Sequence, residues 1–190
     1  MRACLPPSST ANDVEWAEYC QYLADFQASA LERLPPQPQM VAPGVYLGGL
    51  KEAQDVSQLQ SHGVDCVLCL APRDCGPSDT RGFPKSFTTL DIDASDRDDY
   101  DIFERDVPRA MDFIERCLGE GRPVLVHCFA GTNRSATVCA AWLLLRQGMV
   151  LEEVVRHLAF HRGLVLQNPT FNEGLASMAR AEGLLGNHSN

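Results

Sequence analysis

The sequence has no uncharged apolar run that approaches the about 18 residues of a membrane-spanning helix. Its longest such run, from Ala136 to Leu145, is short and suits a buried helix of a globular domain. The first ten residues, MRACLPPSST, are not followed by a hydrophobic region, so we expect no secretory signal peptide. Both absences predict a protein that neither spans nor crosses a membrane.

Basic residues are also scarce, with 16 Lys and Arg against 25 Asp and Glu and a net charge of −9 at pH 7. An acidic surface repels nucleic acid and anionic lipid at long range, so we expect neither nucleic acid nor a membrane surface as a partner. An anionic substrate is not excluded, because a small site can be locally positive.

Eight cysteines without a signal peptide predict reduced thiols, and hence a location in the cytoplasm or the nucleus. Cys66 and Cys69 form a CxxC pair, but within a strand they would point to opposite faces. A zinc site would also need a second pair of ligands, and none is evident at suitable spacing. We therefore expect no bound metal.

The chain of 190 residues, 45% apolar and 22% charged, is typical of one compact domain with an appended segment. Residues 1–39 predict an N-terminal extension. It comprises a Pro/Ser/Thr-rich start, a helix from Asn12 or Asp13 to about Arg33, and the proline-rich stop LPPQPQ. Residues 40–190 then form the main domain.

Short apolar segments in the main domain predict strands at residues 45–47, 64–70, 86–92 and 123–127. Helical patterns lie between and after them, at about residues 52–62, 106–118, 134–147, 151–160 and 171–184. Residues 71–85 and 94–101 have the composition of loops. This alternation predicts an α/β fold, with a mainly parallel central sheet of about four to five strands flanked by helices.

The segment VLVHCFAGTNRSAT carries the strongest chemical signal. Cys128 follows a buried strand, and five residues separate it from Arg134 at the start of a helix. A loop of this length can turn its backbone N–H groups inward and form an anion-binding site at the positive end of the helix dipole. Aligned donors there favour the nucleophilic thiolate of Cys128. The guanidinium of Arg134 can bind two oxygens of a phosphate.

HCFAGTNRS resembles the His-Cys-x5-Arg-Ser/Thr signature of cysteine-dependent protein phosphatases, in particular their small dual-specificity branch. VAPGVYLGGLKEA and VDCVLCLA are similar to the family's first strands, and QNPTFNEGL to the start of its last helix. The resemblance implies the cysteine phosphatase fold. It also implies hydrolysis of phosphotyrosine and phosphoserine/threonine in proteins through a phosphocysteine intermediate, without metal or cofactor.

The resemblance also assigns roles to the residues of this segment. Cys128 is the nucleophile, and Ser135 donates to its sulfur when the intermediate is hydrolysed. Arg134 binds the phosphate together with the loop backbone of Phe129, Ala130, Gly131, Thr132 and Asn133. Asn133 departs from the pattern, because relatives usually carry Ser there. His127 either orders the loop or is a satisfied core residue.

An ester leaving oxygen also needs a general acid. The resemblance places this acid on a loop about thirty residues before the nucleophile, and Asp96 lies 32 residues before Cys128. Asp98 is the next candidate. The same stretch carries further acids, Asp91, Asp93, Asp99 and Asp101. Asn168 either hydrogen-bonds between loops near the site, as the family's Asn does, or is a plain turn residue.

Three alternatives stay open. The chain can also be interpreted as a non-catalytic phosphoresidue-binding pseudophosphatase, or as a phosphatase for phosphoinositides or RNA 5′ ends. The loop FAGTN has no basic residue, whereas phosphoinositide enzymes of this superfamily typically place Lys there.

Cys69 or Cys75 is a candidate to trap oxidised Cys128 as a disulfide. The sequence does not define the oligomeric state.

Overall fold

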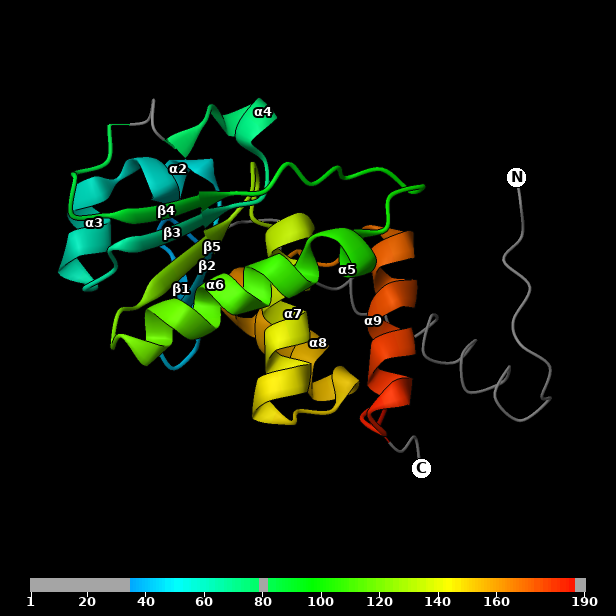
Figure 1. The fold of residues 1–190 in the computed structure, drawn as a ribbon. Helices are drawn as coiled ribbons and strands as arrows, with labels where there is room; N and C mark the ends of the chain where they lie inside the picture. The colour runs from blue at the N-terminus through cyan, green and yellow to red at the C-terminus, as the bar shows by residue number, and fades with distance from the viewer. Residues whose placement is uncertain (1–34, 79–81, 187–190) are drawn as a thin grey trace, which may run out of the picture.

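The computed structural model describes residues 35–78 and 82–186, and within them a five-stranded sheet with the order β1-β2-β5-β3-β4 (Figure 1). The strands are β1 Gln39–Ala42, β2 Val45–Gly48, β3 Cys66–Cys69, β4 Thr88–Asp91 and β5 Val124–His127. β1 pairs antiparallel with β2, and all other pairs are parallel. The predicted fold class is therefore confirmed. The predicted N-terminal helix lies outside the described residues.

Helices cover both faces of this sheet (Figure 1). On one face, α6 Val107–Gly119, α7 Arg134–Gln147 and α8 Leu151–Arg162 contact the strands, and α9 Pro169–Ala181 packs against α7. On the other face lie α2 Leu50–Gln54 and α3 Val56–Ser61, over a smaller apolar cluster that includes Leu59, Val67 and Leu125. β3 and β5 are buried along their whole length because they lie inside the sheet between these layers.

Three predicted segments differ in the structure. The single helix predicted for residues 52–62 is wrong, because α2 ends at Gln54 and α3 begins at Val56. Between them the side chain of Asp55 accepts a hydrogen bond from the Gln58 N–H and caps α3. The loop predicted for residues 71–85 contains the short helix α4 Pro72–Cys75, and α5 Ile102–Arg105 precedes α6.

The parallel strands bring the loops that carry the candidate site residues to one edge of the sheet. Because β2, β3, β4 and β5 run in the same direction, the segments that follow them meet where the strands end. These segments are Gly49 with the start of α2, α4, the acidic loop of residues 94–101, and residues 128–133. Among the described residues, no helix is long and apolar enough to cross a membrane.

Candidate active site

The loop of residues 128–133, here called the catalytic loop, joins β5 to α7 and surrounds a buried thiol. Cys128 is 2% exposed. Its Sγ accepts hydrogen bonds from the Gly131 N–H at 3.3 Å and from the Ser135 hydroxyl at 3.2 Å. Donors directed at a sulfur favour its negatively charged form. The arrangement therefore suits a thiolate.

Carbonyl groups of the catalytic loop are bonded on its outer side. Phe129 O accepts from the Leu50 N–H at 2.9 Å, and Thr132 O accepts from the Leu166 N–H at 2.8 Å. Ala130 O accepts from Nη2 of Arg162 at 2.9 Å. In a planar trans peptide the N–H points away from the carbonyl. The N–H groups that follow these carbonyls, at residues 130, 131 and 133, are therefore turned towards the inside of the loop.

Glycine is required where the catalytic loop meets the end of β2. Gly131 has a φ of +75°, and a Cβ there would lie 2.5 Å from Gly48 O and 2.6 Å from Arg162 Nη2. A Cβ on Gly49 would lie 2.9 Å from Ala130 O. The two backbones therefore approach too closely for any side chain between them.

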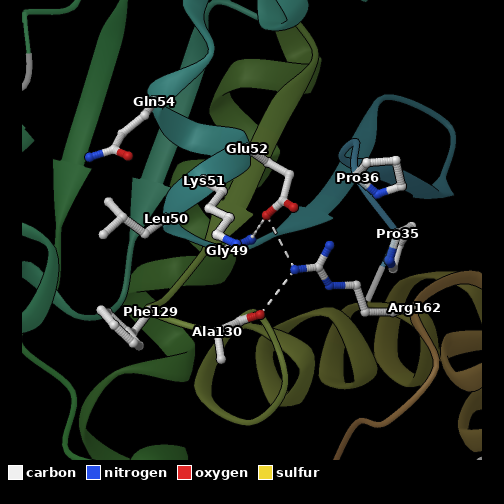
Figure 2. Close-up of a pocket in the computed structure, with 10 residues that line it drawn as sticks. All are labelled: Pro35, Pro36, Gly49, Leu50, Lys51, Glu52, Gln54, Phe129, Ala130 and Arg162. Carbon is white, nitrogen blue, oxygen red and sulfur yellow. Dashed lines mark hydrogen bonds and ion pairs between the residues drawn. The ribbon is translucent and has the colours of Figure 1, made fainter. Parts of the chain in front are cut away.

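Behind the catalytic loop, a buried ion pair forms one wall of a pocket of about 790 Å³ (Figure 2). Arg162, 1% exposed, donates from Nη2 to Glu52 Oε2 at 3.2 Å as well as to Ala130 O. Glu52 Oε2 also accepts from the Gly49 N–H at 2.6 Å. The sequence interpretation missed this pair, because the two residues lie 110 positions apart and neither has a local signal.

Arg134, the first residue of α7, makes its hydrogen bonds through one side of its guanidinium. Nη1 donates to Asp74 Oδ2 at 2.8 Å and to Ala94 O at 3.2 Å. Nε is buried and has no hydrogen-bond partner among the described residues. Buried polar groups are normally hydrogen-bonded, and Nε and Nη2 together form the edge that can bind two oxygens of an anion. The sequence gives no signal for Asp74, because it predicts a loop where the structure has α4.

The charge of Arg134 is secured by its surroundings. Burial works to lower its pKa, but the hydrogen bond to Asp74 and the neighbouring groups Cys128 and Asp96 outweigh burial, so the pKa is raised above its ordinary value. Arg134, which is 8% exposed, therefore keeps its positive charge inside the site.

Asp96 is held above the catalytic loop from two sides. Its Oδ2 accepts from Asn133 Nδ2 at 3.2 Å and lies 3.9 Å from Arg134 Nε. Its Oδ1 accepts from Asn168 Nδ2 at 3.1 Å. Asn168 also caps α9 by accepting from the Phe171 N–H at 3.2 Å. Asn168 thus links the acidic loop to the start of α9, and its role at the site stays a prediction.

The other aspartates of this stretch have different surroundings. Asp91 accepts from Ser78, Asp93 pairs with Arg73, and Asp99 pairs with Arg97. Asp101 caps α5, and Asp98, which is exposed as Asp96 is, accepts from Thr170 through its backbone oxygen.

His127 lies beneath the loop and is fully buried. Its Nδ1 is 3.1 Å from Cys128 O, and because a carbonyl oxygen only accepts, Nδ1 carries the proton. The contact ties the imidazole to the backbone of the nucleophile, which is compatible with both interpretations of this histidine.

Donor atoms of Cys69, Cys75 and His127 lie within 4.8 Å of one another. Structural zinc sites almost always use four protein ligands, and this group supplies three.

Burial raises the pKa of the Cys66, Cys117 and Cys139 thiols, so these cysteines stay protonated at neutral pH. A disulfide between Cys128 and Cys69 or Cys75 stays a prediction.

Comparison with known proteins assigns the family. The sequence model of the dual specificity phosphatase catalytic domain matches residues 45–181, which is well over half of the chain. The chain belongs to the dual-specificity phosphatase family. The match runs from β2 to the end of α9 and so includes the catalytic loop, Asp96 and Asn168 of this dual-specificity phosphatase domain.

Individual relatives agree with this assignment. The chain is 37% identical over 117 residues to dual specificity protein phosphatase PHS1 of Arabidopsis thaliana, covering 62% of this chain but 12% of the relative. It is 34% identical over 131 residues to human dual specificity protein phosphatase 26, covering 66% of this chain and 59% of the relative. The chain thus spans only part of these relatives. The crystal structure of human DUSP28 is similar with a TM-score of 0.69 and 25% identity, over 80% of this chain and 99% of that one.

Proposed function

We propose that this phosphatase domain hydrolyses phosphotyrosine and phosphoserine/threonine in proteins through a phosphocysteine intermediate. The observation that supports this most is the buried Nε of Arg134, which makes no hydrogen bond among the described residues, beside a catalytic loop in which the Gly131 N–H donates to the Cys128 thiol. A buried cation with an open edge, next to a nucleophilic sulfur, suits a phosphate group.

In the first step the sulfur of Cys128 attacks phosphorus, so that an S–P bond forms as the bond between phosphorus and the leaving oxygen breaks. Arg134 and the inward-facing amides bind the non-bridging oxygens, where negative charge develops. Asp96 transfers its proton to the leaving oxygen. The leaving alcohol or phenol therefore departs neutral.

In the second step a water molecule attacks the phosphorus of phosphocysteine. The Asp96 carboxylate accepts a proton from that water, inorganic phosphate forms, and the S–P bond breaks. The Ser135 hydroxyl, 3.2 Å from Cys128 Sγ, donates to the sulfur as it regains its negative charge. No metal or cofactor takes part in this scheme, and an active thiolate suits the reducing environment of the cytoplasm or nucleus.

The side chains of the catalytic loop and the net charge favour phosphoprotein substrates. Residues 129–133 supply no basic side chain that would bind a second phosphate of a phosphoinositide, and the net charge of −9 opposes long-range attraction of RNA. A pseudophosphatase is disfavoured because a thiol, a cation and a carboxylate meet at one site in Cys128, Arg134 and Asp96.

A substrate panel tests the proposal. We expect release of phosphate from p-nitrophenyl phosphate and from phosphotyrosine and phosphothreonine peptides, with little from phosphoinositides or triphosphorylated RNA. Chelator treatment should leave the rate unchanged. Faster turnover of a lipid or RNA would replace the proposed substrate class, and binding of phosphopeptides without release of phosphate would indicate a pseudophosphatase.

Arg134→Lys should lower kcat/KM by on the order of 10²–10³-fold, because lysine keeps the charge but loses the two-point contact with the phosphate. Steady-state kinetics measure this, with thermal unfolding as a check on folding. Arg146→Lys is a matched control, because Arg146 lies near the other end of α7 and pairs with Glu115. An unchanged rate in a folded Arg134→Lys variant would remove Arg134 from phosphate binding.

A further inference from the structure

Asn133 stands at the N-cap of α7 but does not act as a cap. Asparagine is among the residues that most often cap a helix with the side chain. Here the side chain makes no capping hydrogen bond. Its Nδ2 donates to Asp96 Oδ2 at 3.2 Å, and its Oδ1 accepts from the Gln167 N–H at 2.8 Å. The amide is thus used between loops rather than within α7.

These two contacts join three segments that are distant in sequence. Asn133 belongs to the catalytic loop, Asp96 to the acidic loop after β4, and Gln167 to the connection between α8 and α9. Asn168, the next residue of that connection, binds the other carboxyl oxygen of Asp96 at 3.1 Å. Asp96 is therefore held at Oδ2 from the catalytic loop and at Oδ1 from the start of α9.

We propose that Asn133 is a positioning residue that fixes the Asp96 carboxyl group over the phosphate site. This rests on the proposed role of Asp96 as the general acid. A general acid works only within hydrogen-bond reach of the atom it protonates, and small displacements of a reacting group are costly. Oδ2 also lies 3.9 Å from Arg134 Nε, so Asn133 binds the oxygen that faces the phosphate-binding cation.

Other anchors of the acidic loop act on its backbone. Arg134 Nη1 donates to Ala94 O, and Thr170 donates to the backbone oxygen of Asp98. These contacts hold the loop but do not involve the carboxyl group of Asp96. Among the described residues, the hydrogen bonds that orient this carboxyl group come from Asn133 and Asn168.

Serine cannot make the same connection. Its hydroxyl oxygen lies one bond from Cβ, whereas Nδ2 and Oδ1 of asparagine each lie two bonds from Cβ on separate arms. A serine at position 133 is therefore too short to span both Asp96 and Gln167.

The test measures kcat/KM of Asn133→Ser with two aryl phosphates, one whose phenol has a low pKa and one whose phenol has a high pKa. This ratio reports the first phosphate transfer, whereas kcat also contains the hydrolysis of phosphocysteine, which both substrates share. We expect kcat/KM for the high-pKa substrate to fall by roughly 10-fold, and at most about 10²-fold. The low-pKa substrate needs little protonation, so its kcat/KM should change little. Asn172→Ser is the control, because Asn172 also ties the α8–α9 connection, through Leu166 O, without contacting Asp96.

The same substitution in an Asp96→Asn background separates positioning from a structural effect. If Asn133 acts through Asp96, Asn133→Ser should cause no further loss in that background. An equal fall in kcat/KM for both substrates would overturn the proposal for Asn133. So would an undiminished fall in kcat/KM when Asn133→Ser is made in the Asp96→Asn background. If Asp96→Asn itself leaves the leaving-group dependence unchanged, the general-acid assignment fails, which is a separate outcome. Thermal unfolding and binding of inorganic phosphate show whether each variant is folded.

Discussion

Replacing Cys128 by serine should abolish turnover while phosphopeptide binding persists. A serine hydroxyl stays protonated at neutral pH and is a far weaker nucleophile than a thiolate, so the covalent bond to phosphorus cannot form. The inward-facing amides and Arg134 are unchanged by the substitution, so the anion site survives. Steady-state kinetics should show no phosphate release, and calorimetry should show retained affinity for a phosphotyrosine peptide.

A second substitution at the same position sharpens this test. Cys128→Asp places a fixed negative charge inside the loop, so it should lose both turnover and binding by repelling the phosphate. Measurable hydrolysis by Cys128→Ser would contradict a covalent mechanism. Loss of binding in a folded Cys128→Ser variant would place the anion site elsewhere.

The elements that sequence predicted best are those whose ends carry local signals. α7 begins at Arg134 and ends at Gln147, as predicted, because a long apolar segment is closed by Gly148 in the left-handed conformation, with a φ of +64°. β1 was not predicted, since the four residues QMVA become a strand only by pairing with β2. The break at Asp55 was missed because the apolar periodicity continues across it.

In the site, too, the contacts that the sequence predicts are those between residues close in the chain. Cys128, Arg134 and Ser135 are close in sequence, so a loop between a strand and a helix is enough to bring them together. The contacts of Asp74 with Arg134, Glu52 with Arg162, and Asn133 with Asp96 join residues 60, 110 and 37 positions apart. Such pairs depend on how strands and loops are arranged in space. No periodicity or local motif in a single sequence encodes them.

Replacing Asp96 by asparagine should slow hydrolysis of aryl phosphates by roughly 10²–10⁴-fold, the usual contribution of a positioned proton donor. Asparagine is close in size, and its amide oxygen can still accept from either Asn133 or Asn168, but its amide nitrogen cannot accept from the other, and it has no acidic proton. The basic limb of the pH–rate profile should flatten, because a rate that depends on a general acid falls as the acid loses its proton, and asparagine has no such proton to lose. The rate should also depend more steeply on the leaving group, with the smallest loss for phenols of low pKa.

Asp98→Asn is the matched control, because Asp98 lies two residues away in the same loop and is exposed. We expect a small effect on kcat and an unchanged basic limb. If Asp98→Asn flattens the limb and Asp96→Asn does not, the acid is Asp98, and the loop must then turn during catalysis to bring that carboxyl group over the phosphate. Since Asn133 and Asn168 bind Asp96 and not Asp98, the geometry favours Asp96. The assignment of Cys128 as nucleophile does not depend on this outcome, because the sulfur and its two donors lie in the catalytic loop and at the start of α7.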